Sequence, residues 1–232
     1  MLLSVLLGSH PPELPVRSLV RVADLFGISD GSARVALSRL NADGDVVAAD
    51  GVYRLSRRLL QRQADQDRAL RPATRPWRGA WDLAVARPGL SAPERSALGS
   101  DLARLRLAEL RPGVWARPDN LVRPWPAGPS GRVWRFSGRP DLDGREPADL
   151  ARSLWDLEGW AATSERLLAA LKAAPGPPGR FTVAAAIVRH LRDDPVLPPS
   201  LLPRRWPGDR LRDAYAGYRR ELADLLQRQQ AR

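Results

Sequence analysis

The sequence predicts an α+β protein in three parts, and three observations predict it. Near the start, two short amphipathic helices flank a glycine-containing turn and lead into a β-hairpin. In the middle, β-prone runs alternate with one helical stretch, as in an α+β sandwich. The remainder carries leucines at helical spacing. Proline- and glycine-rich breaks and shifts in charge divide the chain into residues 1–72, 73–140 and 141–232.

The first helix is predicted over residues 16–26, where apolar side chains recur at helical spacing and charged ones lie opposite. Gly27 can adopt the left-handed conformation that ends a helix. Ser29 is a suitable N-cap for a second helix, which is predicted over residues 30–42. The buried stripe of this second helix comprises Ala33, Ala36 or Leu37, and Leu40.

A hairpin is predicted over residues 45–56, because Asp50-Gly51 separates two β-prone apolar runs. Helix, turn, helix and hairpin is the order of a winged helix-turn-helix. We therefore interpret residues 1–72 as a DNA-binding domain. Its second helix is expected to enter the major groove, where base edges are distinguishable.

The side chains of this domain that are candidate DNA contacts fall into two sets. Base contacts are expected from the outward side of the second helix, at Ser32, Val35, Ser38 and Arg39. Phosphate contacts are expected from Arg17, Arg34 and Arg54. The hairpin tip is not basic, so only Arg54, beyond the tip, could reach a phosphate from there. For each arginine, a solvated surface charge is the alternative interpretation.

The middle part is predicted to hold strands over residues 81–86, 114–116 and 133–136 and a helix over residues 93–107. Its 12 basic and 5 acidic residues give it +7 of the total charge of +11. This excess favours a polyanionic partner, and double-stranded DNA is the first candidate. The same arginines could instead receive the phosphates of an acidic effector or be scattered over a solvated face.

The last part is predicted to be a helical domain. Helices are expected over residues 148–173, with an interruption near Gly159-Trp160, and over 182–191 and 209–229, while residues 174–179 end the first of them. Trp155, Trp160 and Trp206 are expected in the core. No serine or carboxylate partner for His190 is evident in the sequence, so a structural hydrogen-bonded role is expected, with an effector contact as the alternative.

The composition excludes several classes of protein. The chain has 232 residues and no cysteine, which excludes disulfides, thiolate catalysis and Cys-ligated metal sites. It has only two histidines, far apart, so we expect no metal and no cofactor. No apolar run reaches the roughly 18–20 residues that span a membrane, and the start lacks the features of a signal peptide. A cytoplasmic protein with no membrane partner is expected.

Two long stretches of the sequence resemble the PaaX family of transcriptional regulators. They are LFGISDGSARVALSRLNADGDV, residues 25–46, and HLRDDPVLPPSLLPRRWPGDRLRDAY, residues 190–215. PWRGAW at residues 76–81 and LRPGVWARP at residues 110–118 are also similar to family segments. The resemblance implies a winged helix, a central ferredoxin-like domain similar to the Cas2 fold, and a C-terminal helical domain. It also implies a homodimer, usually a repressor, that an aryl-acyl-CoA thioester releases.

The chain departs from the family pattern in three places. It starts inside what should be the first helix, which is therefore short, and Asp45 stands where a tryptophan is expected. The hairpin is shorter and lacks basic residues at its tip.

After the first strand of the middle domain the sequence reads Arg87-Pro88-Gly89, without the acidic residue that a Cas2-like nuclease needs to hold a metal.

The sequence thus predicts a DNA-binding transcriptional repressor that is not an enzyme. Two other classes remain open at this stage. One is a protein-interaction module in which the winged helix no longer reads DNA, because residues 1–72 carry a net charge of only +2 and an acidic hairpin tip. The other is a metal-dependent nuclease of the Cas2 type.

Overall fold

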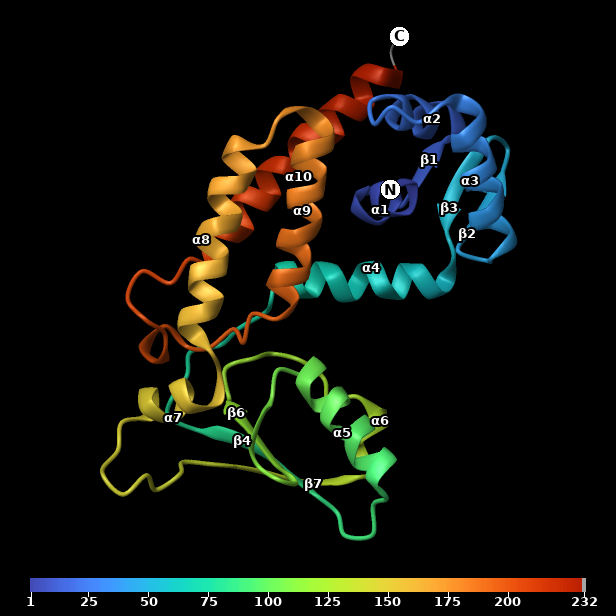
Figure 1. Ribbon diagram of the computed structural model, residues 1–232. Helices are drawn as coiled ribbons and strands as arrows, with labels where there is room; N and C mark the ends of the chain where they lie inside the picture. The colour runs from blue at the N-terminus through green and yellow to red at the C-terminus, as the bar shows by residue number, and fades with distance from the viewer. Residues whose placement is uncertain (231–232) are drawn as a thin grey trace. The chain divides into compact units, whose positions relative to one another are not determined.

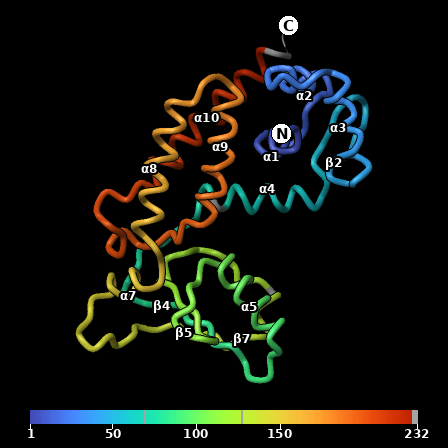
Figure 2. Tube along the Cα trace, viewed as in Figure 1, coloured from blue at the N-terminus to red at the C-terminus, as the bar shows by residue number. Residues whose placement is uncertain are grey.

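The structure is a computed structural model that describes residues 1–230, and the chain divides into two compact units (Figures 1 and 2). The first unit comprises residues 1–71, 164–192 and the chain from residue 208 onward. The second comprises residues 72–163 and 193–207. Both units therefore contain parts of the C-terminal third of the chain, and the three-part division of the sequence stays a prediction.

The first unit begins with six short elements. They are α1 (Leu2–Gly8), β1 (Glu13–Pro15), α2 (Val16–Asp24), α3 (Asp30–Ala42), β2 (Val46–Ala49) and β3 (Val52–Leu55). The strands form an antiparallel sheet in the order β1-β3-β2. The predicted hairpin is confirmed, and Asp50 and Gly51 both have positive φ, 50° and 73°, which suits a two-residue turn between twisted strands.

Local chemistry sets the bounds of α3. The side chain of Ser29 accepts a hydrogen bond from the backbone N–H of Ser32, so the predicted N-cap is confirmed. Asp45 N donates to Leu40 O at 2.9 Å just after the helix. The predicted bounds of residues 30–42 agree with the structure.

The core of the first unit joins these elements to later helices. These later helices are α4 (Arg57–Leu70), α9 (Gly176–Arg192) and α10 (Gly208–Gln230), and the unit also contains the end of α8 (Leu157–Ala173). Leu19, Val22 and Leu37 are fully buried, and Leu226 of α10 belongs to the same cluster. The rings of Phe26 and Phe181 meet edge to face at 5.2 Å. Residues before 60 and after 164 thus share one hydrophobic core.

Two helix boundaries of the last part differ from the prediction. The break lies at Trp155-Asp156, between α7 (Pro147–Leu154) and α8, and not at Gly159-Trp160. Asp156 Oδ1 accepts from Gly159 N at 2.9 Å, and a Cβ on Gly159 would lie 2.1 Å from Asp156 Oδ2. Gly159 therefore makes room for a capping carboxylate inside the first turn. Likewise Gly176-Pro-Pro-Gly opens α9, because the first helical turn needs no N–H from proline.

The second unit contains a four-stranded antiparallel sheet in the order β5-β6-β4-β7 (Figure 1). The strands are β4 (Trp81–Ala86), β5 (Ala108–Arg111), β6 (Val114–Pro118) and β7 (Val133–Gly138). The predicted strands are confirmed with small extensions, and β5, which carries a register shift, was not predicted. The predicted helix over residues 93–107 is α5 (Ala92–Arg104), which a Ser91–Glu94 capping box starts. A short helix, α6 (Ala127–Ser130), occupies a stretch read as loop.

The two faces of this sheet bury different clusters. Leu98 and Leu102 of α5 pack with Trp115 on one face. Trp81 and Ala116 pack on the other with α7 and the 3-10 helix η1 (Pro199–Leu201). In this second cluster Trp160 and Trp206 stack at 4.5 Å, and Trp155 is half-buried beside them. The protein is therefore a mixed α+β protein with two antiparallel sheets and a helical C-terminal part.

Candidate nucleic-acid interface

The outward face of α3 is the best-defined candidate surface of the first unit. Ala33 and Leu37 are fully buried, and between them Arg34 and Val35 are exposed while Ala36 packs partly against the core. Ser32, Val35 and Arg39 are exposed at spacings of three and four residues, which places them on one face of the helix. The apolar side chain of Val35 is 53% exposed, so it is accessible to a partner that approaches this face.

A hollow of about 660 Å³ runs beside this face. It is lined by residues 1–3 at the start of α1, by Ile28 and by outward residues of α3 that include Ser32, Val35 and Arg39. The structure thus brings together three of the four residues predicted to contact bases. The fourth, Ser38, is exposed on α3 and does not line the hollow. No pattern in the sequence predicted that residues 1–3 would lie here.

The candidate arginines differ in their partners. Arg34 Nε donates to Asp30 Oδ1 at 2.6 Å, and Arg54 Nε donates to Glu13 Oε2 at 2.6 Å. Within residues 1–230, Arg17 and Arg39 form no ion pair or side-chain hydrogen bond. All four side chains are exposed. Arg17 and Arg39 are therefore the two candidates whose charge is not offset by a neighbouring carboxylate.

The base of the hairpin is tied to its surroundings by polar contacts. Asp45 pairs with Arg58 at the start of α4 and accepts from Ser56 N through its carbonyl at 2.9 Å. Asn41 Oδ1 accepts from Ala48 N at 3.1 Å, and Val16 N donates to Gly51 O at 2.8 Å. The hairpin is thereby fixed to both α2 and α3, while its tip keeps the acidic Asp50.

His190 has a partner that the sequence did not reveal. Its Nε2 lies 2.9 Å from the Oγ of Ser164, which is 26 residues away in the chain and fully buried on α8. Both residues belong to the first unit. This contact suits the expected hydrogen-bonded role, and an effector contact by His190 stays a prediction.

Two features are absent from the described part of the chain. No helix in residues 1–230 is long and apolar enough to cross a membrane. The same residues contain no group of three or more histidine, cysteine, aspartate or glutamate side chains that could hold a metal ion.

Comparisons with known proteins agree with the sequence resemblance. The model of the PaaX-like protein matches residues 1–59, and the model of the PaaX-like protein C-terminal domain matches residues 155–231. A solved structure, the uncharacterized protein Rv0674 from Mycobacterium tuberculosis, is 45% identical, with a TM-score of 0.87 over 98% of this chain and 96% of that one. No curated protein matches.

These matches define the class as a family of regulators and not of enzymes. The chain belongs to the PaaX-like family.

Proposed function

We propose that the protein is a transcriptional repressor that binds double-stranded operator DNA and that an acidic small molecule, such as an aryl-acyl-CoA, releases it. One observation carries the proposal. The elements α1-β1-α2-α3-β2-β3 and the sheet order β1-β3-β2 support a winged helix-turn-helix, in which α3 would be the recognition helix. The family match over residues 1–59 supports it.

The outward face of α3 offers the chemistry for reading bases. Arg39 can donate two hydrogen bonds to the O6 and N7 of a guanine, and Val35 can contact a thymine methyl group. Ser32 and Ser38 can donate to or accept from either kind of base pair. Arg17, Arg34 and Arg54 are placed to hold phosphates, although two of them must first release a carboxylate.

The proposal extends to the assembly. Two copies would read an inverted repeat with half-sites about one helical turn or a multiple of it apart. The dimer would form through the later parts of the chain. There, the sheet order β5-β6-β4-β7 supports a ferredoxin-like domain similar to Cas2 over residues 73–140, followed by a helical domain over residues 141–232. A nuclease role is disfavoured, because Arg87-Pro88-Gly89 follows β4.

The test is a fluorescence-anisotropy titration against DNA from upstream of the protein's own gene, with scrambled DNA as the control. The salt series should give a log–log slope of about −4 to −5 if four to six phosphates are neutralised. Arg39→Ala should lower affinity for the operator about 10- to 100-fold and reduce the preference over scrambled DNA. Arg62→Ala, an exposed arginine on α4, is the matched control and should leave both unchanged.

Equal, weak binding to both DNAs would overturn the proposal. The apolar lining of the hollow beside α3 would then favour the alternative, a protein-interaction module. If operator binding is found, the same titration can be repeated with CoA thioesters to test release.

A further inference from the structure

The second unit buries an arginine that no carboxylate touches. Arg117, on β6, is 1% exposed. Its guanidinium donates to neutral oxygens alone: Pro118 O at 3.0 Å, Arg106 O at 3.3 Å, Asn120 Oδ1 at 2.8 Å and Val196 O at 3.3 Å. These four bonds give each of its three nitrogens an acceptor, and no carboxylate oxygen is among the acceptors. A buried cation in that state is costly.

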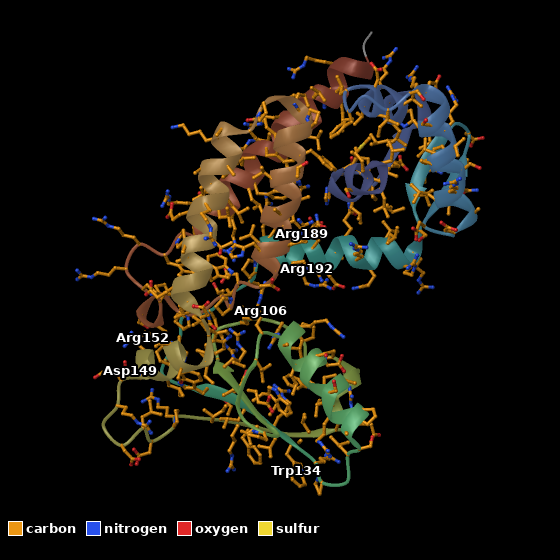
Figure 3. All side chains as sticks on the ribbon, viewed as in Figure 1. Arg106, Trp134, Asp149, Arg152, Arg189 and Arg192 are labelled. Atoms are coloured by element: carbon orange, nitrogen blue, oxygen red, sulfur yellow. The ribbon has the colours of Figure 1, made fainter. Side chains whose placement is uncertain are left out.

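Other arginines surround it. Burial and the nearby Arg123 and Arg106 lower the pKa of Arg117 to about 9. Burial, Arg106 and Arg135 lower the pKa of Arg123 to about 10. Arg106, labelled in Figure 3, follows α5 directly with a φ of 57°. Each of these cations therefore raises the free-energy cost of keeping the others charged.

The carboxylates nearby do not balance the cluster. Asp82 lies opposite Arg117 in the β4–β6 register, and it is the carboxylate that offsets both Arg117 and Arg123. Asp119 adds to this, but its side chain already pairs with Arg75. Arg117, Arg123 and Arg135 thus face two carboxylates, Asp82 and Asp119, and Asp119 is shared with Arg75.

The segment after β6 presents donors that lack acceptors. Arg123 is half-buried, and within the described residues it makes no hydrogen bond or ion pair, so its five N–H groups are uncommitted. Trp125, two residues on, has a buried indole Nε1–H without a partner, and the guanidinium of Arg135 lies 4.2 Å from its ring centroid. Buried donors in native proteins normally have an acceptor.

We propose that Arg106, Arg117 and Arg123 form a binding site for the phosphate or pyrophosphate group of a small anionic molecule. Arg123 would hold the oxyanion with its free N–H groups, and the charge of Arg117 would stabilise it from beneath. Because Arg117 is enclosed, a small anion fits the site better than a DNA strand, whose phosphates meet protruding side chains. The proposal that this site binds an anion does not depend on the proposed function. The proposal that this anion is the effector rests on the proposed function.

A segment that is distant in the sequence, residues 193–198, accepts hydrogen bonds from Arg117 and its neighbour Asn120. Val196 O accepts from both Arg117 and Asn120 Nδ2, the latter at 3.0 Å. Val196 has a φ of 51°, and its N–H donates to Asp194 Oδ1 at 2.7 Å within a buried turn. Segment 193–198 therefore fixes the position of the buried Arg117 guanidinium.

The test is isothermal titration of the full-length protein with inorganic phosphate and with pyrophosphate at constant ionic strength. Saturable pyrophosphate binding is expected, with phosphate weaker. Arg123→Gln should weaken it at least about 10-fold, whereas Arg78→Gln, an equal loss of charge at an exposed position of the same unit, should not change it. Arg123→Lys should recover part of the loss, because the charge remains and the fork of donors is lost.

No saturation by about 10 mM pyrophosphate, or equal weakening by Arg78→Gln, would overturn the site. Should Arg123→Gln fail to fold, hydrogen exchange of the wild-type protein replaces it: pyrophosphate must slow exchange within residues 117–125. Operator binding by Arg123→Gln separates the two proposals. If DNA binding is absent from the wild type while pyrophosphate still binds, the proposed function fails and the anion site stands.

Discussion

The two units use the same residue type in opposite ways. On α3, in the first unit, arginines stand in solvent, and Arg39 has no carboxylate partner among the described residues. Around β6, in the second unit, Arg117 is enclosed and Arg123 is half-buried. Protruding arginines suit a long polyanion that approaches from outside. Recessed ones suit the small anion that we propose, so the burial of an arginine is a better guide to the kind of ligand than the number of arginines nearby.

The aromatic residues make this comparison measurable. All eight tryptophans lie in the second unit, at positions 77, 81, 115, 125, 134, 155, 160 and 206. All three tyrosines, Tyr53, Tyr215 and Tyr218, lie in the first. Tryptophan fluorescence therefore reports on the second unit, and tyrosine absorbance reports on the first.

The largest expected effect is the loss of the buried arginine. Arg117→Met leaves Asn120 Oδ1 without its donor and removes one of the two donors to Val196 O, and we expect the free energy of unfolding to fall by about 3 kcal/mol. Arg39→Met, on an exposed face, should change it by less than about 0.5 kcal/mol. Urea unfolding measures both changes, with tryptophan fluorescence as the probe for Arg117→Met and circular dichroism as the probe for Arg39→Met. A change below about 1 kcal/mol for Arg117→Met would show that the enclosed charge is dispensable.

The next effect is a loss of stability at alkaline pH that is expected of the first unit. Burial raises the pKa of Tyr215 and, more strongly, that of Tyr218, where Tyr215 adds to the shift. The folded state therefore keeps these protons as pH rises past 10, while the unfolded state releases them. Stability of the first unit should fall above pH 10 by up to about 1.4 kcal/mol per pH unit for each tyrosine.

Urea midpoints at pH 9 and pH 11, followed by circular dichroism, measure this loss. Tyr218→Phe should make the fall shallower. Should the midpoint of Tyr218→Phe fall as steeply as that of the wild type, the phenol would not be the group responsible.

A smaller effect is expected from the carboxylate of the arginine cluster. Burial, and after it Asp119, raises the pKa of Asp82, although Arg135, Arg117 and Arg123 oppose the shift. Removing this negative charge by Asp82→Asn should strengthen pyrophosphate binding about 3- to 10-fold, because the ligand no longer competes with it. Glu109→Gln, an exposed position of the same sheet, is the control. Weaker binding by Asp82→Asn would mean that Asp82 positions the arginines.

The smallest effect concerns the paired arginines of the first unit. Asp30→Asn and Glu13→Gln would free Arg34 and Arg54, and each should raise affinity for operator and scrambled DNA alike, by about 2- to 5-fold. Anisotropy at low salt is the measurement, since salt screens exposed charges. An increase confined to the operator would assign these arginines to bases and not to phosphates.

Much of the first unit could be predicted from local sequence. Ser29 and the apolar spacing fix α3, and Asp50-Gly51 fixes the hairpin. The outward residues of α3 follow from helical periodicity, and the Arg34–Asp30 pair follows from a spacing of four residues. Local signals suffice here because the interacting groups are close in sequence.

The second unit shows why the rest could not be predicted. In the sequence, Arg117 cannot be told apart from the other arginines, because its acceptor Val196 O is 79 residues away. In the same way, the partner of His190 and the partner of Arg54 are 26 and 41 residues distant. The break at Trp155-Asp156 depends on a capping carboxylate, so the glycine nearby misled the prediction. Burial and pairing over such separations arise only in the folded chain.

The order in which the chain builds its units has a consequence for how such proteins can diversify. The chain passes between the units four times, after residues 71, 163, 192 and 207. A single recombination event that replaced residues 72–163 with those of a relative would import Arg117 and Arg123 but keep the resident Val196. The imported guanidinium would then meet a foreign turn. We therefore expect a gene of this kind to change its ligand by point substitution more readily than by exchange of a whole module.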